Sequence, residues 1–261
     1  MPGPLRPPSH ILITGASSGI GAALSRRYAS SGVRLSLIGR RRERLDAVAQ
    51  ECKTRGAQCI ACVCDVRNAE QMRCLIEEID GQNPVAMVIA NAGIGGGFVL
   101  AGVSGEAIHV AREIFETNVM GVLNTVMPLV PRFVARGAGH IVIMSSLAAL
   151  VALPEAPVYS ASKAAVRAYG QALGRLLESQ NVSVTVVCPG FVETPMSASL
   201  RRPRPFLWSA ERAADAIVAR LARGKREICF PWPLSMLARM SAHLPPALVQ
   251  HLRQRIKSGQ Q

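Results

Sequence analysis

The chain has 261 residues, a length that suits one large α/β domain or two small ones. Hydrophobic residues make up 49% and charged residues 18%, so a sizeable core is expected and wholesale disorder is not. The net charge of +13 is spread along the chain, apart from arginine clusters at residues 40–42 and 201–204, and no separate basic domain predicts nucleic-acid binding.

The sequence has no feature of export or of membrane insertion. Residues 1–9 are rich in proline and lack the apolar segment of a signal peptide. No run reaches the roughly 18 apolar residues of a membrane-spanning helix. The seven cysteines are an odd number and do not suggest a disulfide framework. We therefore expect a cytoplasmic protein.

Three cysteines lie close together, at Cys59, Cys62 and Cys64. They fall within a strand-like apolar run, where cysteine behaves as a small hydrophobic residue. A structural zinc site needs a second ligand pair at loop spacing, and none follows. We expect these cysteines to pack in the core, and no metal site.

Apolar runs alternate with segments of helical spacing along most of the chain. Strands are expected at residues 10–14, 33–38, 57–64, 85–90, 140–144, 182–188 and 227–230. Helices are expected at residues 19–31, 43–55, 68–80, 106–136, 158–179 and 210–223. Continuous apolar strands separated by helices predict a mostly parallel sheet that is covered on both faces. The pattern therefore indicates an α/β, Rossmann-like, doubly wound fold with seven strands. We expect a single domain over residues 1–261, with its core at about 9–230 and a C-terminal extension at 231–261.

A glycine-rich turn follows the first expected strand, with the spacing G-x-x-x-G-x-G. Glycines allow a sharp turn and a close approach to a pyrophosphate, and the helix that follows offers amide donors and a favourable dipole. The candidate cofactor contacts in this turn are Gly15, Ser17, Ser18, Gly19, Ile20 and Gly21.

The end of the second expected strand distinguishes between the two nicotinamide cofactors. An acidic residue there would bind a ribose 2′-hydroxyl and repel a 2′-phosphate, but this chain has three arginines instead. The planar guanidinium of Arg40 can bind a phosphate, with Arg41 as a second candidate. NADP(H) is therefore expected in preference to NAD(H). The alternative is a basic helix start on the surface, which the helix dipole slightly disfavours.

Two further strand ends carry candidate cofactor contacts. Asp65, followed by Val66, ends the third strand and could accept a hydrogen bond from an adenine amino group. Asn91, Ala92 and Gly93 end the fourth strand, where small residues let a cofactor lie close to the backbone. Each signal is weak alone, because these residue types are common in turns.

Four residues suit proton chemistry. Tyr159 and Lys163 are four residues apart and share a helix face, and a neighbouring ammonium lowers a tyrosine pKa from its ordinary value of about 10. Ser146 follows an apolar strand, at the edge where such sheets bind ligands. Asn118 lies in a helical stretch, where it could form a kink, a cap or a water site. An isolated tyrosine–lysine pair could equally be an exposed pair on an amphipathic helix.

Taken together, these residues resemble the short-chain dehydrogenase/reductase family in its compact single-domain form. The resemblance covers residues 11–230 and keeps the family's order and spacing. It rests on residues 14–21, Asp65, residues 91–93, Asn118, Ser146, Tyr159 with Lys163, and Pro189 with Gly190. One departure is Ala90 before Asn91, where the family often has a second asparagine, and we expect little effect from it.

The resemblance implies a role for each matched residue. Tyr159 would be the acid–base group, and Lys163 would hold the nicotinamide ribose and lower the pKa of Tyr159. Ser146 would bind the reacting carbonyl, and Asn118 would help to hold a water of a proton relay. Contacts to the nicotinamide side of the cofactor would come from Tyr159, Lys163, Pro189, Gly190, Val192 and Thr194.

The resemblance also places substrate choice in the segment that follows Gly190. That segment contains Met196, Leu200, Arg201, Arg202, Arg204, Phe206, Leu207 and Trp208, and a pliable wall is expected from Gly95, Gly96 and Gly97. The apolar residues favour a hydrophobic carbonyl or alcohol substrate, whereas the arginines are more consistent with a solvated loop.

The C-terminal extension has helical spacing at Leu237, Met240 and Leu244. It could pack on a second subunit, cover the active site or rest on a membrane surface. Packing or subunit contact is favoured over membrane contact.

These observations predict an NADP(H)-dependent oxidoreductase that interconverts a carbonyl and an alcohol. The alternative is a non-catalytic NADP-binding regulator or scaffold with the same fold. The family resemblance further implies a homodimer or homotetramer.

Overall fold

The computed structural model describes residues 8–95, 108–151, 153, 156–198 and 204–241. Gly96, Gly97, Leu200, Arg201, Arg202 and Leu244, named above, lie outside the described residues. The fold is built on a sheet of seven parallel strands in the order β3-β2-β1-β4-β5-β6-β7. The strands are β1 (His10–Thr14), β2 (Arg34–Gly39), β3 (Gln58–Val63), β4 (Met87–Ala90), β5 (Gly139–Met144), β6 (Val182–Pro189) and β7 (Glu227–Phe230).

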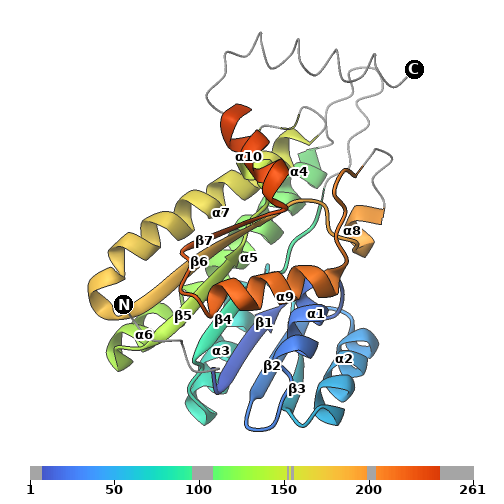
Figure 1. The fold of residues 1–261 in the computed structure, drawn as a ribbon. Helices are drawn as coiled ribbons and strands as arrows, with labels where there is room; N and C mark the ends of the chain where they lie inside the picture. The colour runs from blue at the N-terminus through green and yellow to red at the C-terminus, as the bar shows by residue number, and fades with distance from the viewer. Residues whose placement is uncertain (1–7, 96–107, 152, 154–155, 199–203, 242–261) are drawn as a thin grey trace.

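Helices cover both faces of this sheet, and Figure 1 shows α9 and α1 on one side with α5 and α7 on the other. The α-helices are α1 (Gly19–Tyr28), α2 (Arg42–Thr54), α3 (Ala69–Gln82), α4 (Ile108–Phe115), α5 (Gly121–Val126), α6 (Val130–Arg136), α7 (Pro157–Leu176), α8 (Pro195–Ala198), α9 (Ala210–Leu221) and α10 (Trp232–Ser241). Short 3₁₀ turns lie at η2 (Leu147–Ala149) and η3 (Glu178–Gln180). The predicted doubly wound Rossmann-like fold is therefore confirmed.

Side chains alternate across the sheet and divide the core into two layers. Ile11 and Ile13 of β1 pack with α1, α2 and α9, whereas Leu12 packs with α3, α5, α6 and α7. All three side chains are fully buried. Both faces of β1 are thus covered, which explains its uninterrupted apolar sequence.

The expected helix at residues 106–136 was wrong as one continuous element. A π-helical turn, η1 (Glu116–Met120), separates α4 from α5, and α5 ends at Val126 before α6 begins at Val130. Pro128 lacks the amide hydrogen that would continue α5. Pro131 instead falls in the first turn of α6, where proline is tolerated.

Strand β3 lies at the edge of the sheet, so its apolar run is only partly buried. Ile60 and Val63 are 40% and 42% exposed. Cys59 and Cys64 are buried in the core layers and Cys62 packs against one of them. The expected packing of these cysteines is thus observed. Within the described part of the chain, no helix has the length and apolarity needed to cross a bilayer.

A buried ion pair joins α3 to α6. The Asp80 side chain is 3% exposed, and its carboxylate accepts hydrogen bonds from Arg136 (2.8 and 3.0 Å), from Arg132 (3.2 Å) and from the amide of Val85 (2.9 Å). Burial raises the pKa of Asp80, but these hydrogen bonds outweigh that effect and the pKa is lowered. The carboxylate thus fixes the chain where α3 leads into β4.

We predict that Asp80→Ala lowers the free energy of unfolding by about 3 kcal/mol, because two guanidinium groups and one amide lose their acceptor. Urea denaturation of the two proteins measures this difference. Asp46→Ala is the matched control, since Asp46 makes an exposed pair with Arg42 and should cost less than about 1 kcal/mol. An equal loss of unfolding free energy in the two variants would contradict the stabilising role assigned to the buried Asp80 carboxylate.

Candidate active site

A cavity of about 740 Å³ opens at the carboxyl ends of the strands, around the point where the strand order reverses between β1 and β4. This is the edge at which doubly wound sheets bind ligands. Most of the predicted site residues line it: Gly15, Ser17, Ser18, Gly19, Ile20, Arg40, Asp65, Val66, Asn91, Ala92, Gly93, Ser146, Tyr159, Lys163, Pro189, Gly190, Val192 and Thr194. Gly21 and Asn118 are not in the lining and lie behind it.

The glycine-rich turn forms one wall of the cavity. Gly15 and Gly19 have φ values of +65° and +54°, which only glycine adopts without strain. A Cβ on Gly21 would lie 2.3 Å from the Gly15 oxygen and 2.5 Å from Asn91 Nδ2, so α1 can begin close behind the turn only with glycine there. The turn is therefore a tight cradle at the N-terminus of α1.

Asn91 holds this turn in place from the end of β4. Its Nδ2 donates to the carbonyls of Thr14 (3.0 Å) and Gly15 (3.2 Å), while Thr14 Oγ1 accepts from the amides of Asn91 (3.1 Å) and Ala92 (3.2 Å). The Asn91 amide group is thus engaged with the protein backbone. From the sequence, Asn91 was only a candidate cofactor contact, and no pattern indicated that Asn91 and Thr14 hold the glycine turn in place.

Arg40 and Asp65 lie at one end of the cavity, with Arg40 Nη1 3.8 Å from Asp65 Oδ2. Arg67 donates to Asp65 from its backbone amide (3.0 Å), from Nε (3.0 Å) and from Nη2 (2.7 Å). Burial raises the pKa of Asp65, yet Arg67 and then Arg40 outweigh it, so the pKa is lowered. Asp65 is therefore an ionised carboxylate between two arginines. Sequence reasoning missed Arg67, whose spacing two residues after Asp65 is the signal of a local Asp–arginine pair.

Tyr159 and Lys163 lie in the first two turns of α7, which begins with Pro157. The Lys163 ammonium is 5.9 Å from the centre of the Tyr159 ring. Lys163 is 4% exposed, and its Nζ donates to the Met144 carbonyl (3.0 Å) at the end of β5. Burial lowers the pKa of Lys163 to about 8. The predicted pair thus lies on one helix face toward the cavity, with the lysine anchored to the sheet.

Two serines follow β5 and have different surroundings. Ser146 Oγ accepts from the Ala148 amide (3.1 Å), which caps the short η2 turn, and lies 3.5 Å from the Pro189 carbonyl. Ser145 Oγ donates to the Lys163 carbonyl (2.8 Å) and fastens α7 to β5. Of the two hydroxyls, only that of Ser146 was a candidate from the sequence, and its residue lines the cavity together with Ser145.

Asn118 sits in the π-helical turn η1 and is fully buried. Its Oδ1 accepts from the Ile94 amide (2.8 Å), and its Nδ2 donates to the Ile94 carbonyl (3.0 Å) and to Ser162 Oγ (3.1 Å). A Cβ on Gly93 would lie 3.2 Å from both Asn118 Oδ1 and Lys163 Nζ. Asn118 therefore stands beside Lys163, and its kink takes the form of a π turn, a feature often found at functional sites.

Thr117, which precedes Asn118, also lines the cavity. It was not among the candidates identified from the sequence. Its hydroxyl is buried with no hydrogen-bond partner in the described part of the chain. An unpaired buried hydroxyl is costly, so it is a candidate contact for a bound molecule.

The segment after β6 closes over the glycine turn. A Cβ on Gly19 would lie 2.8 Å from Thr194 Cγ2, and Thr194 exchanges hydrogen bonds with Ser197. Val192 is buried and pairs with Trp208 through an isolated bridge. Trp208 stacks on Phe230, with ring centres 4.9 Å apart, so it belongs to the core and not to the cavity.

The substrate-side expectations are met only in part. Met196 lines the cavity, whereas Arg204, Phe206 and Leu207 do not. Helix α10 contributes Leu234, Leu237 and Ala238 to the lining. The extension beyond β7 thus forms part of the cavity wall, in line with one of the three possibilities named for it, that it covers the active site.

Comparison with known proteins agrees with this geometry. A family model described as short chain dehydrogenase matches residues 9–205. An uncharacterized oxidoreductase of Myxococcus xanthus is 35% identical over 250 residues, which cover 94% of this chain and 96% of the relative. A putative ketoacyl reductase of Streptomyces coelicolor is 35% identical over 219 residues, with coverages of 82% and 83%.

Among solved structures, a short-chain dehydrogenase from Sphingobium yanoikuyae in complex with NADPH has a TM-score of 0.75 and 28% identity, and the match covers 95% of each chain. The family model and the relatives in sequence agree, and the chain belongs to the short-chain dehydrogenase/reductase family of oxidoreductases.

Proposed function

We propose that the protein is an NADP(H)-dependent oxidoreductase that interconverts a carbonyl and an alcohol, with Tyr159 as the acid–base group. The observation that carries the proposal is one cavity lined by the glycine turn and Arg40 as well as by Ser146, Tyr159 and Lys163. A nucleotide site needs the glycine turn and a cation such as Arg40. Proton transfer to a substrate oxygen needs the two hydroxyls and the lysine.

The residues present fit a dinucleotide. The Gly15–Gly19 cradle and the N-terminus of α1 suit a pyrophosphate, and the space at Gly93 that a Cβ would fill lies against Asn118 and Lys163. We assign Arg40 to the 2′-phosphate and Asp65 to the adenine side. The NADPH complex of the Sphingobium yanoikuyae relative supports this preference.

When bound, the nicotinamide would supply or accept the hydride. Tyr159 would give its phenolic proton to the substrate oxygen or take a proton from it, and Ser146 would donate a hydrogen bond that positions this oxygen. Lys163, as a cation 5.9 Å from the Tyr159 ring, favours the phenolate and so lowers the energy of proton transfer. Asn118 orients the backbone at Ile94 beside the lysine, a placement that suits the relay role.

The substrate is proposed to be hydrophobic. Apolar residues that line the same cavity as Ser146 and Tyr159 include Leu147, Val151, Leu153, Met196 and Leu234. The ketoacyl reductase name of the Streptomyces coelicolor relative fits a carbonyl on an apolar chain.

Self-association is part of the proposal. Phe115, Met120 and Met127 are 42%, 48% and 58% exposed along the segment from α4 through η1 to the end of α5. A second copy of the chain would cover such residues, which a monomer leaves in water. A cytoplasmic location stays a prediction.

Tyr159→Phe should lower turnover by about 10²–10⁴-fold, because the ring stays and the transferable proton is lost. NADPH binding, followed by fluorescence titration, should change little. A panel of apolar ketones and aldehydes with NADPH measures turnover. Full activity in the variant would exclude Tyr159 as the acid–base group, and a wild-type protein that binds NADPH but reduces nothing would favour the non-catalytic alternative.

Arg40→Asp should weaken NADPH binding by about 10–100-fold, the loss expected for one charge-assisted contact, while NADH binding is retained or improved. The ratio of the two dissociation constants is the measurement. Arg42→Asp makes the same charge change two residues away, in a residue that pairs with Asp46 and does not line the cavity. It should leave the ratio unaltered, and an equal shift in both variants would point to net charge alone.

The affinity for NADPH should fall as pH rises through about 8, the pKa of the buried Lys163. Below this pH the ammonium is present and can bind the cofactor, and above it the charge and one donor are lost. In Lys163→Met the affinity should be low and independent of pH over the same range. Wild-type affinity that stays constant well above pH 8 would show that the bound cofactor does not need the ammonium.

A further inference from the structure

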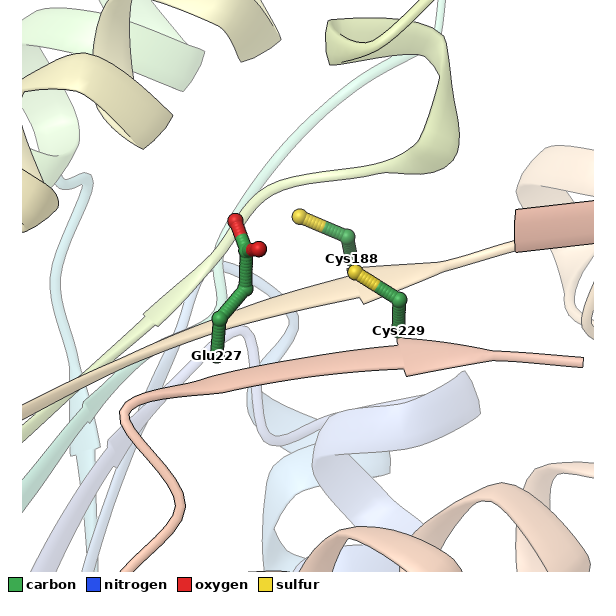
Figure 2. A group of neighbouring side chains, drawn as sticks. All are labelled: Cys188, Glu227 and Cys229. Atoms are coloured by element: carbon green, nitrogen blue, oxygen red, sulfur yellow. The ribbon is translucent and has the colours of Figure 1, made fainter. Parts of the chain in front are cut away.

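Two cysteines face each other on neighbouring strands at the β7 edge of the sheet. Cys188 of β6 and Cys229 of β7 are directly paired in the strand register. Figure 2 shows both side chains on the same side of these strands, together with Glu227. The two sulfur atoms and the carboxylate lie within 4.8 Å of one another. Cys188 is fully buried and Cys229 is half-buried.

The surroundings of Glu227 disfavour a metal ion at this cluster. Its carboxylate accepts from Arg167 Nε (2.8 Å), Gln171 Nε2 (3.2 Å) and Arg239 Nη2 (2.7 Å). The same Arg239 nitrogen also lies 3.6 Å from Cys229 Sγ. Two guanidinium groups therefore already neutralise the carboxylate, and a divalent cation would meet their repulsion. The two thiols remain as the reactive part of the cluster.

The two thiols differ in their acidity. The interaction with Cys188 and, next, the contact with Arg239 lower the pKa of Cys229, against the effects of burial and of the nearby Glu227 carboxylate. The shared hydrogen bond and burial raise the pKa of Cys188. Because Arg239 Nη2 lies 3.6 Å from Cys229 Sγ and Cys188 is fully buried, we assign Cys229 as the thiol that ionises. A cysteine stabilised as thiolate beside a cation reacts with oxidants more readily than an ordinary buried thiol.

We propose that Cys188 and Cys229 form a reversible redox site that hydrogen peroxide converts to a disulfide. The Cys229 thiolate attacks one peroxide oxygen, the O–O bond breaks, and Cys229 becomes a sulfenic acid with release of hydroxide. The Cys188 sulfur then attacks the Cys229 sulfur, the S–O bond breaks, and the hydroxyl leaves as water with the Cys188 proton. Peroxide is reduced by two electrons and the thiol pair is oxidised by two. A dithiol reductant reverses the bond by exchange.

The strand register is compatible with this bond, because Cys188 and Cys229 are directly paired. Neighbouring strands are about 4.7–4.9 Å apart, within the roughly 4.4–6.8 Å between the Cα atoms of cysteines in disulfides. Closing the bond then requires the two side chains to rotate toward each other. The site lies next to the cavity, because Cys188 precedes Pro189, which lines it, and the Arg239 partner of Cys229 belongs to α10.

Peptide mapping of the full chain tests this proposal without an activity assay. After peroxide treatment, alkylation and trypsin digestion without reductant, peptides 176–201 and 227–239 each carry one cysteine, Cys188 and Cys229. We expect them joined, with the loss of two hydrogen atoms, as the main cross-linked species. Treatment with dithiothreitol should return both as separate alkylated peptides.

Variants distinguish the order of steps. In Cys188→Ser the cross-link should vanish and a dimedone adduct should accumulate on Cys229, whereas in Cys229→Ser neither product should form. Arg239→Gln should slow cross-linking several-fold, because the thiolate loses its cation. The matched control is Cys74→Ser, which removes an exposed thiol on α3 and should leave the cross-link unchanged.

Two results would overturn the proposal. In the first, peroxide oxidises other cysteines of the wild-type protein, while the peptides 176–201 and 227–239 remain separate and alkylated. The other is zinc bound at one equivalent by the reduced protein that protects both cysteines from alkylation, which would make the cluster a metal site.

Discussion

The buried ammonium of Lys163 is the constraint on which the arrangement of the site depends. Removing a lysine charge from water is costly, and the cost here is offset in part by the Met144 carbonyl at 3.0 Å. That hydrogen bond ties α7 to the end of β5, and Ser145 reinforces it through the Lys163 carbonyl. Tyr159, four residues earlier on the same helix, is thereby held over the cavity.

The same lysine restricts its neighbours. A Cβ on Gly93 would lie only 3.2 Å from Asn118 Oδ1 and from Lys163 Nζ, so both side chains would have to shift to admit one. Asn118 in turn requires the π-helical turn, which widens one turn of the helix and directs the amide group toward Ile94. A kink, a glycine and a buried charge thus form one packed unit, and a change in any of them would displace the others.

The two ends of the cavity differ in electrostatics. At the Arg40 end the charges are partly exposed and paired, since Asp65 lies between Arg40 and Arg67. Solvent screens these groups, so they suit the binding of a phosphate more than a change of protonation. At the Lys163 end burial lowers the pKa to about 8, near the range in which proton transfer is useful. The proposed nucleotide binding and the proposed proton chemistry would thus have separate environments within one cavity.

Local sequence patterns were sufficient to predict much of the fold and of the candidate site. The glycine turn between an apolar strand and a helix, and the tyrosine–lysine spacing on one helix face, are set by neighbours within a few residues. For this reason the parallel, doubly wound sheet, the cavity edge and most of its lining residues could be predicted, whereas the order of the strands in the sheet came from the structure. The continuous helix at residues 106–136 failed because periodicity does not register the local effect of Pro128.

Other features join residues that are distant in the chain. Asn91 reaches the Thr14 carbonyl across 77 residues, and Arg167 reaches Glu227 across 60. The facing of Cys188 with Cys229 depends on the register of β6 with β7, and the contribution of α10 to the cavity depends on how the chain returns after β7. By itself the sequence determined the fold class and the residue types brought to the sheet edge, because these depend on local spacing. Only the tertiary structure decided which side chains neutralise, support or oppose one another there, because those contacts follow from the packing of strands and helices far apart in sequence.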